Sequence, residues 1–232
     1  MSKKCIVCLD PGHGPGTVNG SPDGTYKELE FTWDMYTRIR PLLEKQGIKV
    51  IATRGQNEKP SLLARCKISN NAKADLVISL HTNAAGSSGW VDACGLLVYT
   101  SAGPETALRN VAALAMLRRF KAVGVNVRGA GLVHNMDLTV LAKTDSPACL
   151  IEYGFHTNRE DVALLKDSAY RDKLAIATAQ GICDYLGIAY QKAADGMRDT
   201  VQKRFGLADD TIKYLGKYQY SDELFRKLAT LG

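Results

Sequence analysis

Residues 5–14 read Cys-Ile-Val-Cys-Leu-Asp-Pro-Gly-His-Gly, an apolar run that stops at a proline and two glycines. A short apolar run bounded by such turn residues is typical of a buried strand, here Cys5–Asp10, followed by a loop that begins at Pro11. Residues 76–81, Leu-Val-Ile-Ser-Leu-His, and residues 149–153, Cys-Leu-Ile-Glu-Tyr, have the same character. The three runs predict buried strands of one sheet.

Segments with helical periodicity lie between these strands. The other expected elements are, in order, a helix over Glu28–Gln46, a strand over Ile48–Thr53, a helix over Ser61–Ala74, a strand over Gly95–Thr100, a helix over Glu105–Ala122, a loop around Arg128-Gly129, and helices over Glu160–Lys166 and Tyr170–Leu186. Pro41 predicts a kink or a break in the first of these helices. The alternation predicts an α/β fold, in which a mostly parallel twisted sheet carries helices on both faces.

The length of 232 residues fits one well-buried domain and a small appendix. We expect the domain to span residues 1–188. From about Tyr190 charged residues alternate with aromatics such as Phe205, Tyr214 and Phe225, which predicts a small helical C-terminal segment over residues 189–232. A hydrophobic fraction of 45% and a charged fraction of 23% are those of soluble globular proteins and exclude a disordered or membrane chain.

The N-terminal sequence and the cysteines indicate the cellular compartment in which the chain is made. The run Cys5–Asp10 is too short for a signal peptide or a membrane span, so we expect cytoplasmic synthesis without a signal peptide and no membrane insertion. The six cysteines are then expected to be reduced thiols. Cys5 and Cys8 form a C-x-x-C pair, but residues three apart in a strand face opposite sides, which disfavours zinc binding by this pair. The net charge of +6 fits a polyanionic partner.

Four residues that can do chemistry are expected at one edge of the sheet, because active sites in such folds lie at the carboxyl ends of strands. His13 follows the first strand, His81 ends another, Glu28 opens the first helix and Glu152 lies near the end of a third strand. Two imidazoles and one carboxylate suit Zn²⁺ and leave its fourth position open. The other carboxylate is then available as a general base. Each residue alone also fits a structural role, such as a helix-start carboxylate for Glu28.

Five landmarks carry a family resemblance that spans Cys5 to Leu186. They are LDPGHG, GIKVIATR, SLLARCKISNNAKADLVISLHTNAA, NVRG and PACLIEYGFHTNRED. In order and spacing they resemble the zinc-dependent N-acetylmuramoyl-L-alanine amidases of the type 3 group, found among bacterial autolysins and phage endolysins.

The resemblance implies a role for each candidate residue. It assigns His13, Glu28 and His81 as zinc ligands and Glu152 as the catalytic glutamate. Asn83 follows the second histidine as in the family pattern and is a candidate for substrate binding. His134 lies outside the ligand positions of the family; it is a second candidate for substrate binding because it precedes the strand that bears Glu152.

The chain departs from the family pattern at two positions. Leu29 stands where the family often has a residue such as lysine, and Glu30 comes next, so Glu30 is a rival for the ligand position of Glu28. His156 stands where the family usually has an apolar residue, and we expect it at the surface.

The implied function is peptidoglycan hydrolysis for cell lysis, by cleavage of the amide between N-acetylmuramic acid and L-alanine with Zn²⁺ as cofactor. The alternative is a catalytically silent peptidoglycan-binding or regulatory protein of the same fold. A peptidase that cuts within the stem peptide also stays open on chemistry alone.

Bacterial peptidoglycan is the expected partner, reached after release from the cytoplasm. Nucleic acid is not expected, since the sequence shows no recognition motif and no concentrated basic run. Residues 189–232 are interpreted either as a wall-binding region or as a tail that packs onto the domain. The sequence leaves the oligomeric state open.

Overall fold

The computed structural model describes residues 4–191, 200–217 and 221–230. The chain divides into two compact units, Met1–Ile188 and Ala189–Gly232. We describe each unit by itself. The roles expected for the two units, catalysis and wall binding, stay predictions.

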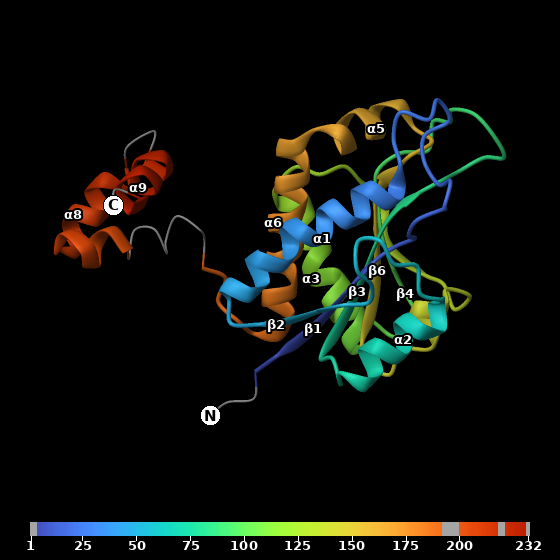
Figure 1. Ribbon diagram of the computed structural model, residues 1–232, viewed down its shortest axis with the longest axis horizontal. Helices are drawn as coiled ribbons and strands as arrows, with labels where there is room; N and C mark the ends of the chain where they lie inside the picture. The colour runs from blue at the N-terminus through green and yellow to red at the C-terminus, as the bar shows by residue number, and fades with distance from the viewer. Residues whose placement is uncertain (1–3, 192–199, 218–220, 231–232) are drawn as a thin grey trace. The chain divides into compact units, whose positions relative to one another are not determined.

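A six-stranded sheet forms the centre of the first unit (Figure 1). Its strands are β1 (Ile6–Pro11), β2 (Lys49–Ala52), β3 (Leu76–Asn83), β4 (Leu96–Thr100), β5 (Val127–His134) and β6 (Ala148–Phe155), in the spatial order β2-β1-β3-β6-β4-β5. Neighbouring strands are parallel except for β4 and β6, which are antiparallel. The expected α/β fold with a mostly parallel sheet is therefore confirmed.

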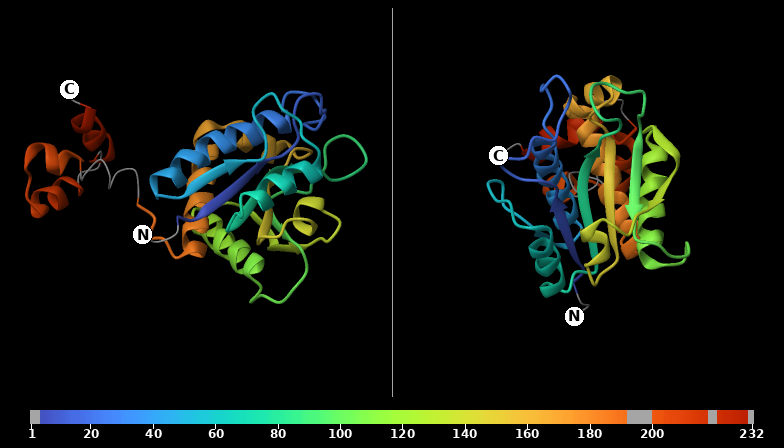
Figure 2. Two further views of the ribbon diagram at one scale, coloured as in Figure 1. Left: turned by 60° about the horizontal axis from the view of Figure 1, so that its bottom comes forward. Right: turned by 90° about the vertical axis from the view of Figure 1, so that its right-hand side faces the viewer.

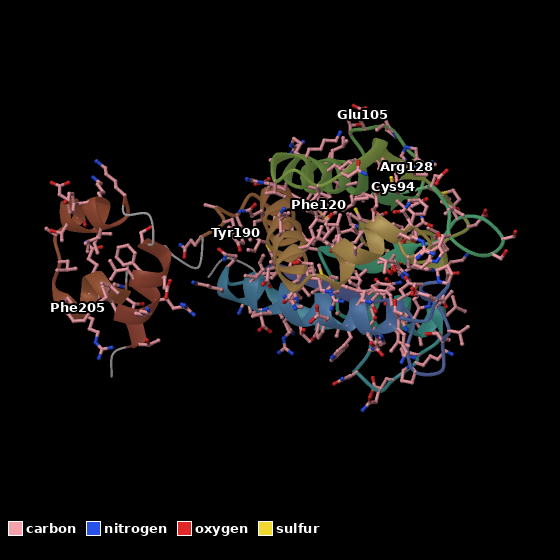
Figure 3. The ribbon with its side chains drawn as sticks, turned by 90° about the horizontal axis from the view of Figure 1, so that it is seen from above. Cys94, Glu105, Phe120, Arg128, Tyr190 and Phe205 are labelled. Atoms are coloured by element: carbon pink, nitrogen blue, oxygen red, sulfur yellow. The ribbon has the colours of Figure 1, made fainter. Side chains whose placement is uncertain are left out.

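Helices cover both faces of this sheet (Figure 2). They are α1 (Glu28–Lys45), α2 (Leu62–Asn71), α3 (Leu108–Ala122), α4 (Thr139–Ala142), α5 (Arg159–Lys166) and α6 (Ser168–Leu186). On one face the rings of Phe31 from α1 and Phe120 from α3 contact Tyr153 of β6. Phe120 points from its helix into the packed interior (Figure 3). On the other face Cys66 of α2 packs with Cys8 of β1 in a second apolar cluster.

Local sequence explains where several helices begin and end. The hydroxyl of Ser61 accepts a hydrogen bond from the backbone of Ala64 at the start of α2, and Asn158 caps α5 in the same way. Gly187 ends α6 with φ 68°, a left-handed conformation that glycine adopts without a steric penalty. All six cysteines are free.

The structure corrects two of the expected elements. Of the kink or break expected at Pro41, the break does not occur: helix α1 continues through Pro41, because the buried side chains of Ile39 and Leu43 on either side hold the helix against the sheet. The segment Arg128-Gly129, expected as a loop, lies inside strand β5. The two residues lie where the pairing of β4 with β5 shifts its register, as in a β-bulge. A bulge interrupts the alternation of polar and apolar residues by which a strand is predicted from sequence, so it could not be predicted here.

The second unit contains short helices in its described residues. Residues 200–205 are helical, and α8 (Asp209–Leu215) and α9 (Ser221–Thr230) follow. Val201 and Phe225 are fully buried, whereas Phe205 is 47% and Tyr214 76% exposed. No helix in the described part of the chain is both long and apolar enough to span a membrane.

Candidate functional site

Four side chains that can do chemistry come from the carboxyl ends of β1, β3 and β6. His13 follows the end of β1, and Glu28 is the first residue of α1. His81 of β3 is paired in register with Glu152 of β6. Paired positions on adjacent strands point to the same face, so His81 and Glu152 are neighbours on one side of the sheet.

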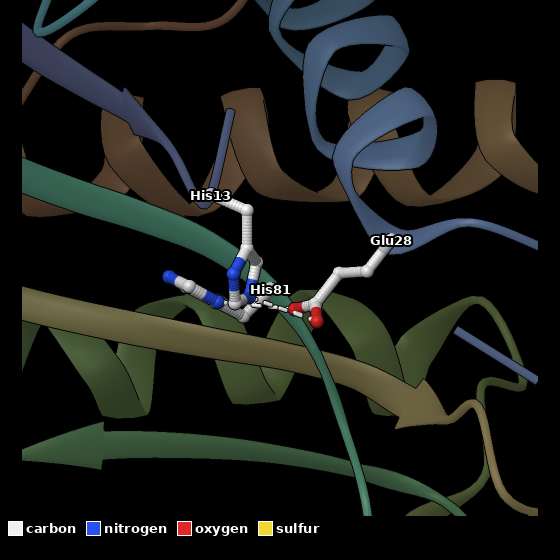
Figure 4. Close-up of side chains that lie close together, drawn as sticks. All are labelled: His13, Glu28 and His81. Carbon is white, nitrogen blue, oxygen red and sulfur yellow. Dashed lines mark hydrogen bonds and ion pairs between the residues drawn. The ribbon is translucent and has the colours of Figure 1, made fainter. Parts of the chain in front are cut away.

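His13, Glu28 and His81 point toward one another from a loop, a helix and a strand (Figure 4). His13 Nε2 lies 2.9 Å from Glu28 Oε2, and His81 Nδ1 lies 3.1 Å from Glu28 Oε1. One donor atom from each residue lies within 4.8 Å of the others, which is close enough to hold one metal ion. Two imidazoles and a carboxylate form the donor set of an open zinc site. The residues present therefore fit Zn²⁺.

The backbone at Gly12 makes room for this arrangement. A Cβ atom at that position would overlap the imidazole ring of His81. The imidazole of His81 therefore packs directly on the main chain, and only glycine fits there. The next residue, His13, has φ 59°, a left-handed conformation that is uncommon outside glycine. Strain of this kind persists only where the surrounding structure holds it.

Two buried arginines and an aspartate hold the turn that carries His13. Arg65 of α2 pairs with Asp10 at 2.8 Å and also donates to the carbonyls of Pro11 and His13. Arg54 donates to the carbonyls of Pro11 and Gly12. Both arginines are 3% exposed. The turn is therefore fixed by charge-assisted hydrogen bonds to its backbone.

Asp10 is itself fully paired. Its carboxylate accepts hydrogen bonds from the hydroxyls of Thr53 and Ser79 in addition to Arg65. Burial raises the pKa of this carboxyl, but Arg65 and the two hydroxyls outweigh burial and hold the pKa below its ordinary value. Sequence reasoning missed this network. The signal was Asp10 itself, because a carboxylate in a buried strand requires a cationic partner.

The charges of the ligand group depend on one another. Burial raises the pKa of Glu28, but hydrogen bonds with His13 and His81 outweigh it and bring the pKa well below the ordinary value. Burial lowers the pKa of His81, yet the contact with Glu28 raises it to about 9. Without a metal, a proton on His81 therefore takes the place of a cation beside Glu28. A bound metal ion displaces such a proton.

Glu28 also contacts a group of three residues outside the ligand set, Thr82, His156 and Tyr26, which are linked to one another. The backbone N–H of Thr82 donates to Glu28 Oε1 at 2.8 Å. His156 Nδ1 lies 3.1 Å from the hydroxyl of Thr82 and 3.9 Å from Glu28 Oε2. Tyr26 donates its hydroxyl proton to Thr82 and stacks on the ring of His156. The expectation of a surface histidine at 156 is wrong: the residue is 4% exposed, because β6 continues to Phe155 and carries it beneath the site.

Glu152 differs from Glu28 in its surroundings. Its Oε2 atom is buried and has no hydrogen-bond partner among the described residues. Burial is the main cause that raises the pKa of Glu152 to about 8; the charge of His81 opposes it, and the charge of Glu28 adds to it. Two carboxyls with pKa values pushed in opposite directions are typical of a site with one permanent anion and one proton carrier.

The remaining sequence candidates fall in different places. Glu30 is exposed and pairs with Lys27 at 3.2 Å, so it does not lie with the ligand group. Asn83 ends β3 two residues after His81, and its amide lies 3.5 Å from the hydroxyl of Tyr99.

The structure does not bring His134 together with the other candidates. β5 runs antiparallel to β6, and the carboxyl end of β5 therefore lies at the opposite edge of the sheet. His134 is exposed there beside Thr100. Its position before β6 in the sequence did not predict proximity to Glu152.

Comparisons with known proteins agree on one family. The model of the family described as N-acetylmuramoyl-L-alanine amidase matches residues 7–184. An endolysin of Bacillus phage SPP1 is 33% identical over 191 residues, which cover 81% of this chain and 68% of the phage protein. A germination-specific N-acetylmuramoyl-L-alanine amidase of Bacillus subtilis is 31% identical, over 78% of this chain and 79% of that protein.

A solved structure has the same fold. The N-acetylmuramoyl-L-alanine amidase from Clostridium difficile 630 superposes with a TM-score of 0.72 at 27% identity, over 80% of this chain and 98% of the other. The family match covers the sheet except for Ile6, the first residue of β1, and includes all four candidate residues. On these grounds the chain belongs to the N-acetylmuramoyl-L-alanine amidase family.

Proposed function

We propose that this chain is a zinc-dependent hydrolase that cleaves the amide between N-acetylmuramic acid and the L-alanine of the stem peptide in bacterial peptidoglycan. One observation carries the proposal: His13, Glu28 and His81 offer three donor atoms within 4.8 Å of one another. Glu152 lies beside them, at the position paired with His81. Family membership supports the amide as the bond that is cut.

Each residue has a distinct task in this proposal. Zn²⁺, when held by His13, Glu28 and His81, supplies a Lewis acid that polarises a carbonyl and lowers the pKa of water. Glu152 accepts the proton of the attacking water and then delivers it to the departing alanine amine. A carboxyl whose pKa is raised by burial suits both steps near neutral pH, since it holds and releases a proton with little cost.

The arginine network has a supporting task. Arg65 and Arg54 hold the backbone around His13, so the first imidazole is oriented before the metal arrives. Pre-orientation of ligands by surrounding hydrogen bonds raises metal affinity. A catalytically silent binding protein would not need all four positions, and the chain retains them all.

Product analysis tests the bond that is cut. We expect digestion of purified peptidoglycan to release stem peptides with a new N-terminal L-alanine, seen by mass spectrometry. Intact muramoyl–alanine links together with cleaved stem peptides would instead identify a peptidase.

Chelation tests the metal. We expect one zinc per chain, and loss of activity when the zinc is removed, because the fourth coordination position is where the reaction takes place. Full activity in a demonstrably zinc-free sample would contradict this part of the proposal. Re-addition of zinc is the control for damage by the chelator.

We also propose that the second unit, residues 189–232, contributes to binding of the wall. Exposed Phe205 and Tyr214 alternate with basic residues there, a combination that fits glycan faces or anionic wall polymers. A chain that ends at Ile188 should then cleave soluble muramoyl peptides at the rate of the full chain but sediment less with whole walls. Equal sedimentation would rule out the wall-binding role, and a lower melting temperature would favour packing onto the first unit.

A role in cell lysis is supported by the phage endolysin among the relatives. Synthesis of the protein inside bacteria, followed by permeabilisation of the membrane, should lyse the cells. A Glu152→Gln chain produced at the same level is the control.

A further inference from the structure

A cavity of about 380 Å³ opens directly beside the proposed metal ligands. His13 and His81 line one side of it. The loop before α2 lines another side with Lys59, Pro60 and Ser61, and Leu62 at the start of α2 joins them. The volume lies at the lower end of the range for small-ligand sites, and it can take a short piece of peptide. The cavity is therefore continuous with the place where the amide is cut.

The loop that carries Lys59 is packed against the turn that carries His13. A Cβ atom at Gly14 would lie 2.7 Å from the carbonyl oxygen of Glu58 and 3.0 Å from Cβ of Lys59. Glu58 also accepts a hydrogen bond from the backbone of Gly55 at 2.7 Å, which closes the loop on itself. The backbone at Lys59 is thus held close to the proposed ligands, although its side chain is exposed.

The charged residues that line the cavity include one cation that forms no ion pair with a described residue. Besides the histidines, its charged residues are Asp10, Arg65 and Lys59. Asp10 and Arg65 pair with each other at 2.8 Å and their side chains are each 3% exposed. Within the described residues, the ammonium group of Lys59 has no ion pair. The cavity therefore favours an anionic group next to the cleavage point.

We infer that Lys59 binds the α-carboxylate of the second stem-peptide residue. This inference rests on the proposed function. In peptidoglycan the L-alanine is followed by D-glutamate, whose α-carboxyl is either free or amidated. Two residues of extended chain span at most about 7 Å, so this carboxylate stays close to the amide that is cut. The muramic acid carries no free carboxylate, because its lactyl carboxyl forms that amide. Because Lys59 is cationic, the cavity is assigned to the stem peptide and not to the muramic acid.

Two soluble substrates that differ in one group test this inference with the full zinc-loaded chain. One is N-acetylmuramoyl-L-alanyl-D-glutamate with a free α-carboxylate, and the other is its α-amide. We expect the kcat/KM of the wild type to be about three- to five-fold higher for the free acid, which is the effect of one exposed ion pair. The difference should lie in KM. Soluble substrates contain no wall polymer, so a phosphate of the wall cannot produce this preference.

Three substitutions sharpen the test. Lys59→Gln should abolish the preference, Lys59→Arg should retain it, and Lys59→Glu should reverse it toward the amide. Lys67→Gln is the matched control, because Lys67 is an exposed lysine of α2 that does not line the cavity. Zinc content and melting temperature should be the same in all variants.

Specific outcomes overturn the inference. Equal kcat/KM of the wild type for the two substrates would do so while leaving the amidase proposal intact. An equal change in Lys59→Gln and Lys67→Gln would show a general charge effect and would also overturn it. No cleavage of either substrate or of whole peptidoglycan would remove the proposed function and this inference together.

Discussion

The two edges of the sheet differ in what their strand ends carry. At the carboxyl ends of β1, β3 and β6, histidines meet a buried carboxylate, and a buried Asp10–Arg65 pair supports the turn above it. At the end of β5, on the opposite edge, His134 is exposed and its Nδ1 lies 3.0 Å from the hydroxyl of Thr100. Both edges have a histidine at a strand end. In the described part of the chain, His13 and His81 lie beside the carboxylate of Glu28, whereas His134 lies beside a neutral hydroxyl.

The difference shows that strand direction decides which strand-end residues can cooperate. Three parallel strands bring their last residues to one edge, where the chain is free to turn and side chains converge. The antiparallel pairing of β4 with β6 sends the ends of β4 and β5 away from that edge. Four substitutions, taken from the largest expected effect to the smallest, test the comparison.

Replacement of the buried aspartate should have the largest effect. Asp10→Asn leaves Arg65 buried without its partner, and we expect the free energy of unfolding to fall by about 3–5 kcal/mol. Urea denaturation at neutral pH measures this loss. Asp34→Asn is the control, because Asp34 pairs with Arg38 and Arg171 near the surface and should cost under about 1 kcal/mol.

The same aspartate predicts a pH dependence. Folding lowers the pKa of Asp10 from its ordinary value of 3.8. The stability it contributes is therefore fully present above that value and is lost as the pH falls through the lower folded pKa. The difference between wild type and Asp10→Asn should shrink on acidification through this window. A constant difference would show that the carboxylate charge is not what stabilises this edge.

Replacement of the proposed proton carrier should affect turnover alone. We expect Glu152→Gln to lower kcat by about a hundredfold or more, the scale of a lost general base, because the amide cannot accept the water's proton. The variant should keep its zinc and its melting temperature. Loss of zinc from Glu152→Gln would mean that Glu152, and not Glu28, is the carboxylate ligand.

The arginine that holds the His13 turn should act through metal affinity. Arg65→Lys keeps the charge beside Asp10 but loses the fork that also reaches the carbonyls of Pro11 and His13. We expect zinc affinity to fall about tenfold in competition with a chelator, the lower end for a residue that supports a ligand. Cobalt substitution should show an altered visible spectrum. Arg119→Lys, at the surface pair with Asp184, should change neither measurement.

The smallest effect is expected at the opposite edge. His134→Gln should leave kcat/KM within about twofold of the wild type, because the residue lies at the other end of the sheet from Glu152. Asn83→Ala is the comparison at the carboxyl edge, and we expect it to raise KM. A tenfold loss in His134→Gln would show that the substrate extends across both edges.

The sequence by itself determined the fold class, the family and the chemistry of the candidate residues. Short apolar runs that are followed by Pro-Gly, histidine or glycine are local signals, and they predicted strands β1, β3 and β6 within a few residues. The residue types needed for a zinc site could likewise be read directly, since two histidines and one glutamate near the ends of predicted strands are the ligands that an open zinc site uses.

Only the tertiary structure decided which residues meet. Asp10 and Arg65 are 55 residues apart, and Thr82 and His156 are 74 apart, so no local pattern reports their contacts. The burial of His156 and the distance of His134 from the site both follow from strand order and direction. Those are properties of the whole sheet, because pairing between distant segments is chosen by the packing of all six strands and their helices together.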